Sequence, residues 1–200
     1  MTRPIVGIDP GRDGGAVILA PDGRHVMAAF RWRHSASNWF NLRSVAANVA
    51  GPAVRVSSLG EVGAAIARRV PAGCVLVVEG LFVPRVPKGR KPDAKYLGQV
   101  ARIVTLGEYA GQVFGPASCR AVMTLRPTAG EWRATILGIP ANSPSKFAEA
   151  HAIQALTKAR PPLVVGLGDL ATDPHVAEAA CIARWGWLKA RQAAKFGRAS

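Results

Sequence analysis

The sequence predicts an α/β fold with one mixed β-sheet flanked by α-helices. Three short apolar runs come first, and later apolar runs alternate with segments of helical spacing, which is the pattern of such a fold. The chain has 200 residues, of which 49% are hydrophobic, enough to build a sizeable core without disulfides or metal staples. We therefore expect residues 1–200 to form a single domain.

Antiparallel hairpins are predicted at the start of the chain. Residues 4–9, 16–20 and 25–32 are short apolar runs with strand character. They are separated by turn signals at 10–15 and 21–23, both rich in Gly and Asp. Such turns join neighbouring antiparallel strands, so three paired strands are expected here.

The remainder of the chain predicts helices that alternate with strands. Apolar residues recur at helical spacing over 57–70, and the β-branched run 74–78 then predicts a buried central strand parallel to the first. Further along, we expect a strand at 120–125 and helices at 94–114, 127–137, 143–158 and 175–194.

The charge balance points to a polyanionic partner. Twenty-six Lys and Arg face twelve Asp and Glu, which gives a formal net charge of +14. Positive residues gather in a loop at 84–95 and in a helix and tail at 184–200. Apolar runs fall short of the roughly 18 residues that cross a membrane, so nucleic acid is favoured over lipid, although a generally basic proteome would also explain the charge. No signal peptide and no paired cysteines are visible, which favours the cytoplasm.

Two acidic residues directly follow predicted apolar strands, where a role in keeping the surface soluble does not explain them. Asp9 ends the first apolar run, and Glu79 ends the run 74–78. If those strands are parallel neighbours, the two side chains lie roughly 5 Å apart at the edge where α/β sheets form their sites. A divalent cation such as Mg²⁺ or Mn²⁺ would relieve their repulsion. Taken singly, Asp9 would fit a role in the turn as well as a role in a metal site, and Glu79 would fit a buried ion pair equally well.

A third acidic residue lies at the start of the last predicted helix. His175 and Glu178 are three residues apart, so both point to one helix face whose other members are small. A polar pair on an apolar face needs a partner, which Asp9 and Glu79 would supply. A lone histidine is more often an ordinary structural residue, and Asp173 before Pro174 is typical of a helix N-cap.

These motifs resemble those of the RuvC-type Holliday-junction resolvases. Val6-Gly7-Ile8-Asp9-Pro10-Gly11 is similar to the first motif, and Val77-Val78-Glu79-Gly80-Leu81-Phe82 to the second. The segment from Tyr96 to Ala101 resembles the helix that follows, and the segment from His175 to Ala183 the last motif. The basic loop and Glu131-Trp132-Arg133 resemble compact bacteriophage versions. The family commonly has Asp where Glu178 stands, and its Gly- and Lys-containing motif is missing from 126–158.

The resemblance implies a ribonuclease H-like fold with a five-stranded mixed sheet, and an endonuclease that nicks four-way DNA junctions symmetrically. Its catalytic and metal-binding residues would be Asp9, Glu79, His175 and Glu178, holding two Mg²⁺ or Mn²⁺ ions. Two strands to cut imply a homodimer, with the helix from Tyr96 to Phe114 at its interface, in a bacterial or phage-infected cell. DNA contacts would come from Phe82, Arg85, Lys88, Arg90, Lys91, Lys95 and Lys146.

Other functions remain open from the sequence. Actin-like ATPases and sugar kinases also begin with a strand, an Asp and a Gly-rich turn, but 200 residues leave little room for their second phosphate loop. A nuclease of the same fold that cuts flaps, forks or RNA would share the metal site. A non-catalytic nucleic-acid-binding protein is the third alternative.

Overall fold

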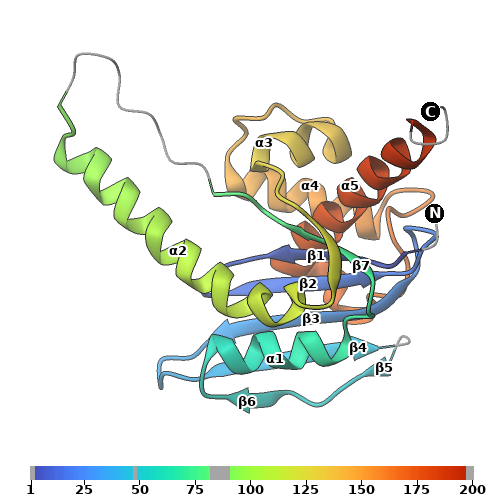
Figure 1. The fold of residues 1–200 in the computed structure, drawn as a ribbon, viewed down its shortest axis with the longest axis horizontal. Coiled ribbons are helices and arrows are strands. Elements are labelled where there is room, and N and C mark those ends of the chain that lie inside the picture. The colour runs from blue at the N-terminus through green and yellow to red at the C-terminus, as the bar shows by residue number, and fades with distance from the viewer. Residues whose placement is uncertain (1–2, 47–48, 82–90, 197–200) are drawn as a thin grey trace.

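A single mixed sheet forms the centre of the molecule (Figure 1). The computed structural model describes residues 3–46, 49–81 and 91–196, and all statements about the structure refer to these. The central strands follow the order β3-β2-β1-β7-β8. Their bounds are β1 (Ile5–Asp9), β2 (Gly14–Leu19), β3 (Val26–His34), β7 (Cys74–Val78) and β8 (Ala121–Leu125).

The directions of these strands confirm the predicted mixed, ribonuclease H-like sheet. β1, β2 and β3 form two consecutive antiparallel pairs, as the Gly-rich turns between them predict. β7 then pairs in parallel with β1, and β8 in parallel with β7. The carboxyl ends of β1 and β7 therefore lie side by side at one edge of the sheet.

The sheet extends beyond the five predicted strands. Within the described residues it has eight, because a further antiparallel strand pairs with β3 and itself carries two short strands. These additional strands are β4 (Phe40–Ala46), β5 (Val49–Ala50) and β6 (Val54–Val56). Their segment lacks a long apolar run, so these strands depend on their neighbours: β4 pairs with β3, and β5 and β6 pair with β4.

The helices agree closely with the expected segments. α1 (Leu59–Arg69) begins at the N-cap Ser58, whose side chain accepts a hydrogen bond from the Glu61 amide. One difference lies in the segment 127–137, which is a short α-helix followed by a π-helix. The other bounds are α2 (Ala94–Ser118), α3 (Ala129–Trp132), the π-helix Arg133–Leu137, α4 (Ser145–Thr157), the 3₁₀ helix Gly168–Thr172 and α5 (Pro174–Phe196).

The helices cover both faces of the sheet and create two cores. α5 packs on β1 and β2 with α4 beside it, whereas α1 and the C-terminal part of α2 cover the opposite face (Figure 1). The N-terminal half of α2 projects away from the sheet (Figure 1). No helix in the described part of the chain is long and apolar enough to cross a membrane.

Glycines in the sheet allow α5 to approach the strands very closely. A Cβ atom at Gly7 would lie 2.3 Å from the carbonyl oxygen of Ala179, and one at Gly15 would lie 2.5 Å from that of His175. Only glycine avoids these backbone clashes, and the small residues of α5 complete the contact. This packing places the start of α5 directly over the end of β1.

Candidate metal centre at the carboxyl ends of two parallel strands

Asp9 and Glu79 lie next to each other at this edge, as the sequence predicts. The parallel register pairs Ile8 with Val78, and the Glu79 amide donates a hydrogen bond of 3.4 Å to the Ile8 carbonyl oxygen. Alternate residues of a strand share a face, so Glu79 belongs with Val77 to the face that α5 covers. Asp9 belongs to the same face, because it is paired with Gly15 of β2, and a Cβ atom at Gly15 would point at His175 of α5.

The start of α5 brings His175 and Glu178 to Asp9. Ligand atoms of Asp9, His175 and Glu178 all lie within 4.8 Å of one another. Nδ1 of His175 donates a hydrogen bond of 2.8 Å to Oδ2 of Asp9. The i, i+3 spacing on one helix face therefore produces the predicted pair. Glu79 lies beside this group but is not one of its three members.

Asp173 fixes the position at which α5 begins. Its Oδ1 accepts hydrogen bonds from the amides of His175 at 3.1 Å and Val176 at 3.4 Å, which makes it the predicted N-cap. Its Oδ2 accepts from Nε of Arg31 at 2.8 Å and from Arg33 at 3.2 Å, both on β3. Asp173 thus ties the helix to the sheet, and its role here is positional.

The electrostatics of the group favour an added cation. Burial, followed by the charges of Asp9 and Glu79, raises the pKa of Glu178 to about 8, against a smaller lowering by Arg133. Burial, followed by the charge of Asp9, raises the pKa of Glu79 to about 7. The hydrogen bond to Asp9 raises the pKa of His175 to about 9. Glu79 and Glu178 therefore hold protons more readily than ordinary carboxyls, and Arg133 and His175 offset only part of the negative charge of the group.

Two residues of this site were not assigned a role from the sequence. Nε1 of Trp132 donates a hydrogen bond of 3.0 Å to Oε2 of Glu79, and the indole is fully buried. The guanidinium of Arg133 is also buried and lies 3.4 Å from Oε1 of Glu178. The Thr128–Glu131 capping box predicts that a helix starts here. The position of Trp132 and Arg133 against the site also depends on the junction between α3 and the π-helix, which that pattern does not predict.

The donor set fits a divalent metal ion. Three carboxylates and one imidazole converge on the edge of the sheet; Glu178 is buried, and Asp9 and Glu79 are partly buried. Oxygen ligands suit Mg²⁺ and Mn²⁺, and the imidazole shifts the preference toward Mn²⁺. A cation bound between these groups would replace the protons that they otherwise hold.

A row of arginines leads away from this centre on the same face of the sheet. Cross-strand pairing aligns Asp9 with Gly15, Gly15 with Arg31, and Arg31 with Arg43. Directly paired residues share a face, and Arg33 joins that face two residues after Arg31. Arg43 lies 2.7 Å from Asp169, and the side chains of Arg33 and Arg43 are 52% and 39% exposed. This arginine row (Arg31, Arg33 and Arg43) was not predicted.

The predicted DNA-contact residues are spread more widely. Lys91 precedes α2, Lys95 lies in its first turn and Lys146 in the first turn of α4, and all three are exposed. Phe82, Arg85, Lys88 and Arg90 fall outside the described residues. In the basic C-terminal helix, Arg184 donates a hydrogen bond of 2.9 Å to the Gly23 carbonyl oxygen, and its guanidinium lies over the Trp187 ring, so it has a packing role.

Comparison with known proteins gives a likeness in structure only. A solved structure of RuvC from Thermus thermophilus matches with a TM-score of 0.40 and 14% sequence identity, over 94% of this chain and 96% of that one. No protein-family model matches the sequence. No curated protein matches it. A likeness at this TM-score does not extend to activity, so the functional proposal rests on the residues of the site.

Proposed function

We propose that this chain is a metal-dependent endonuclease that hydrolyses phosphodiester bonds in branched DNA, nicking four-way junctions in symmetric pairs. The observation that carries the proposal is the convergence of Asp9, His175 and Glu178 within 4.8 Å, beside Glu79, at the carboxyl ends of two parallel strands. The order and spacing of the RuvC-like motifs that contain these residues support it further.

Asp9, Glu79, His175 and Glu178 would hold two Mg²⁺ or Mn²⁺ ions. When bound, such ions activate a water molecule for attack on phosphorus and stabilise the oxygen that leaves. Direct attack by water on the phosphodiester would need no covalent intermediate on the protein.

The remaining residues of the site orient these groups and balance their charge. Trp132 holds the carboxylate of Glu79 in place through its indole N–H. Arg133 places a buried positive charge beside Glu178, and its two contacts through Nη atoms are both long, at 3.4 Å. In our proposal, Arg133 has donor capacity left for an oxygen of the scissile phosphate.

Positive residues around the site would bind the DNA backbone. The arginine row begins two strands away from Asp9, and Lys91, Lys95 and Lys146 provide further exposed charges. Arg85, Lys88 and Arg90 would extend this surface, and Phe82 would stack on an unpaired base at the branch point. Phosphate contacts of this kind provide affinity and position but not sequence choice.

A homodimer would present two such sites to the two strands of a junction. The projecting half of α2 offers an apolar surface for this, because Leu97 and Val104 are 56% and 57% exposed. We propose α2 as the interface, and the cytoplasm of a bacterial or phage-infected cell as the place of action.

Cleavage of a labelled synthetic four-way junction in Mg²⁺ or Mn²⁺ tests the function. The wild type is compared with Asp9→Asn and Glu79→Gln, and Glu61→Gln serves as the control, because Glu61 is an exposed carboxylate in the first turn of α1, outside the site and the proposed interface. We expect paired symmetric nicks from the wild type and the control, and none from the two site variants, although all four proteins bind the junction.

Three other outcomes would change the proposal in different ways. Cleavage of flaps, forks or RNA in place of junctions would replace the substrate and keep the chemistry. Binding without cleavage of any nucleic acid, with either metal, would leave a non-catalytic binding protein. Full activity in Asp9→Asn would overturn the proposed site itself.

A further inference from the structure

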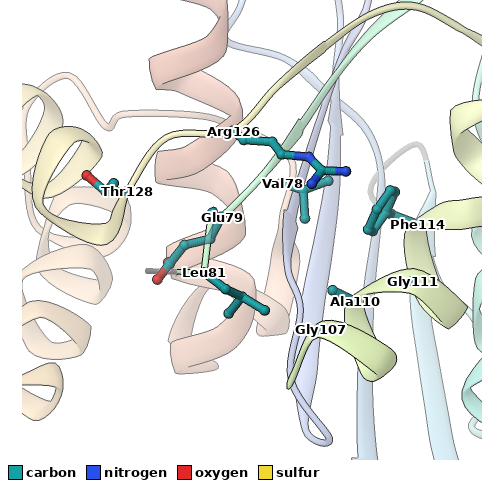
Figure 2. A pocket seen from close by; sticks show the side chains of 10 residues that line it. Val78, Glu79, Leu81, Gly107, Ala110, Gly111, Phe114, Arg126 and Thr128 are labelled. Carbon is teal, nitrogen blue, oxygen red and sulfur yellow. The ribbon is translucent and has the colours of Figure 1, made fainter. Parts of the chain in front are cut away.

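A pocket lies beside the candidate metal centre, between the end of β7 and α2 (Figure 2). Its volume is about 480 Å³, within the range of about 300–1,000 Å³ that small-molecule sites occupy. Glu79 lies on one side, and Phe114 of α2 on the other (Figure 2). The hydrogen bond of 2.7 Å from the Gly80 amide to the Pro127 carbonyl oxygen brings Arg126 and Thr128 to its rim.

The wall that α2 provides is unusually open. Gly107 and Gly111 lie one helical turn apart on the pocket side. A Cβ atom at Gly111 would meet nothing within 4 Å, and one at Gly107 only Leu81 at 3.6 Å. Packing within the described chain therefore does not require glycine here, although each glycine costs a helix about 1 kcal/mol relative to alanine. The space in front of these two glycines is open to a flat group.

The opposite end of the pocket combines an aromatic ring with a cation. The guanidinium of Arg126 lies 5.3 Å from the centroid of the Phe114 ring, and Figure 2 shows it extending over Val78 toward that ring. Arg126 is exposed, whereas Phe114 is half-buried and packs against the core under α1 and α2. Aromatic faces and guanidinium planes are the surfaces on which unpaired nucleobases stack.

We propose that this pocket receives an unstacked nucleobase from the nucleotide that adjoins the phosphate held at Glu79. The base would lie against Gly107 and Gly111 and stack at the end formed by Phe114 and Arg126. This inference rests on the proposed function, since it takes the bound strand to pass Glu79. The net charge of +14 and the cation at the rim favour a nucleotide over a neutral apolar ligand.

Filling the pocket tests the proposal. The variant Gly111→Leu places a side chain in the open space, and Gly98→Leu is its matched control, since Gly98 is an exposed glycine of the same helix with nothing within 4 Å of its Cβ position. A second pair compares Arg126→Gln with Arg69→Gln, which removes an exposed arginine at the end of α1.

The readout is the binding of a short single-stranded DNA that contains one 2-aminopurine, titrated without metal and followed by the fluorescence of that base. We expect Gly111→Leu and Arg126→Gln to weaken binding by about 5-fold or more, which corresponds to the loss of one base stack. Gly98→Leu and Arg69→Gln should bind like the wild type. Melting temperatures and oligomeric states are compared for all variants, because Gly98 and Gly111 both lie on α2, the proposed dimer interface. If either glycine variant alters assembly, the stacking signal decides: the quenching of 2-aminopurine on binding should be lost in Arg126→Gln and kept in Arg69→Gln, whereas a mere phosphate contact would leave it unchanged.

The outcomes separate this proposal from the nuclease proposal. Equal binding by all four variants would overturn the pocket, even if the wild type cuts junctions. Weaker binding confined to Gly111→Leu and Arg126→Gln would support the pocket, even if no cleavage is found with either metal. Dependence on Arg126 but not on Gly111 would reduce Arg126 to a phosphate contact and overturn the pocket as a base site.

Discussion

Nε1 of Trp132 donates a hydrogen bond of 3.0 Å to Oε2 of Glu79, and this bond joins the start of the π-helix to the end of β7. Fifty-three residues separate the two partners along the chain. Glu79 is partly buried, and because burial disfavours the charged form of a carboxylate, a donor of this kind stabilises it. The indole therefore favours ionised Glu79, the form able to bind a cation.

Replacement of Trp132 tests this role. Trp132→Phe keeps an aromatic ring but removes the donor, so the pKa of Glu79 should rise further above its present value of about 7. We expect the acid limb of the pH–rate profile for junction cleavage to move to higher pH, with activity largely recovered in alkaline buffer. Stability should fall by about 1–3 kcal/mol from the unsatisfied carboxyl group. An unchanged acid limb with reduced stability would leave Trp132 a packing role only.

The stability of the metal-free protein should fall as the pH rises. The folded-state pKa values of Glu79 and Glu178, about 7 and about 8, lie above the ordinary 4.5, so the folded state binds more protons than the unfolded state between these values. His175 acts in the same direction, and its contribution is present below pH 6.5 and lost as the pH rises through about 9.

Melting temperatures measured in EDTA from pH 5 to pH 9 check this prediction. We expect a continuous decrease over that window, with a shallower slope in Glu178→Gln. Mn²⁺ should raise the melting temperature more at pH 8 than at pH 6, since the ion competes with protons for the same groups. A metal-free stability that rises across this window would contradict the assigned burial of these carboxyls.

Close packing of α5 on the sheet should be sensitive to a single methyl group at Gly7. In Gly7→Ala, the new Cβ would lie 2.3 Å from the backbone oxygen of Ala179, so α5 must move away from β1. We expect a loss of at least about 1–3 kcal/mol in urea unfolding, together with weaker Mn²⁺ binding, because α5 carries His175 and Glu178. Gly98→Ala is the control, and its stability should be unchanged or higher.

The arginine row should contribute to DNA binding independently of the metal centre. For Arg33→Gln and Arg43→Gln, we expect weaker junction binding and a salt dependence whose slope falls by about 0.9 per lost phosphate contact. Mn²⁺ binding should be unaffected, and Arg69→Gln should behave like the wild type. An unchanged slope combined with a lower melting temperature would show that these arginines serve only their contacts with Asp169 and Asp173.

The sequence by itself determined the local features of this protein. Gly-rich turns predicted the hairpins of β1 to β3, the apolar run of β7 predicted a buried strand, and helical spacing located α5. Asp9 and Glu79 end their strands, and His175 and Glu178 share one helix face, for reasons of periodicity alone. Such features depend on residues close together in the chain, so they are readable from it.

Only the tertiary structure decided which distant residues meet. Of the edge strands, β4 pairs with β3, whereas β5 and β6 pair with β4, and no long apolar run in their own sequence predicts them. Trp132, the last residue of α3, and Arg133, the first of the π-helix, join the site because these helices pack against α5. The arginine row exists because cross-strand pairing aligns β3 with β4 residue by residue. Contacts of this kind depend on strand register and on close packing across the whole domain. Neither can be predicted from the residues of one segment alone.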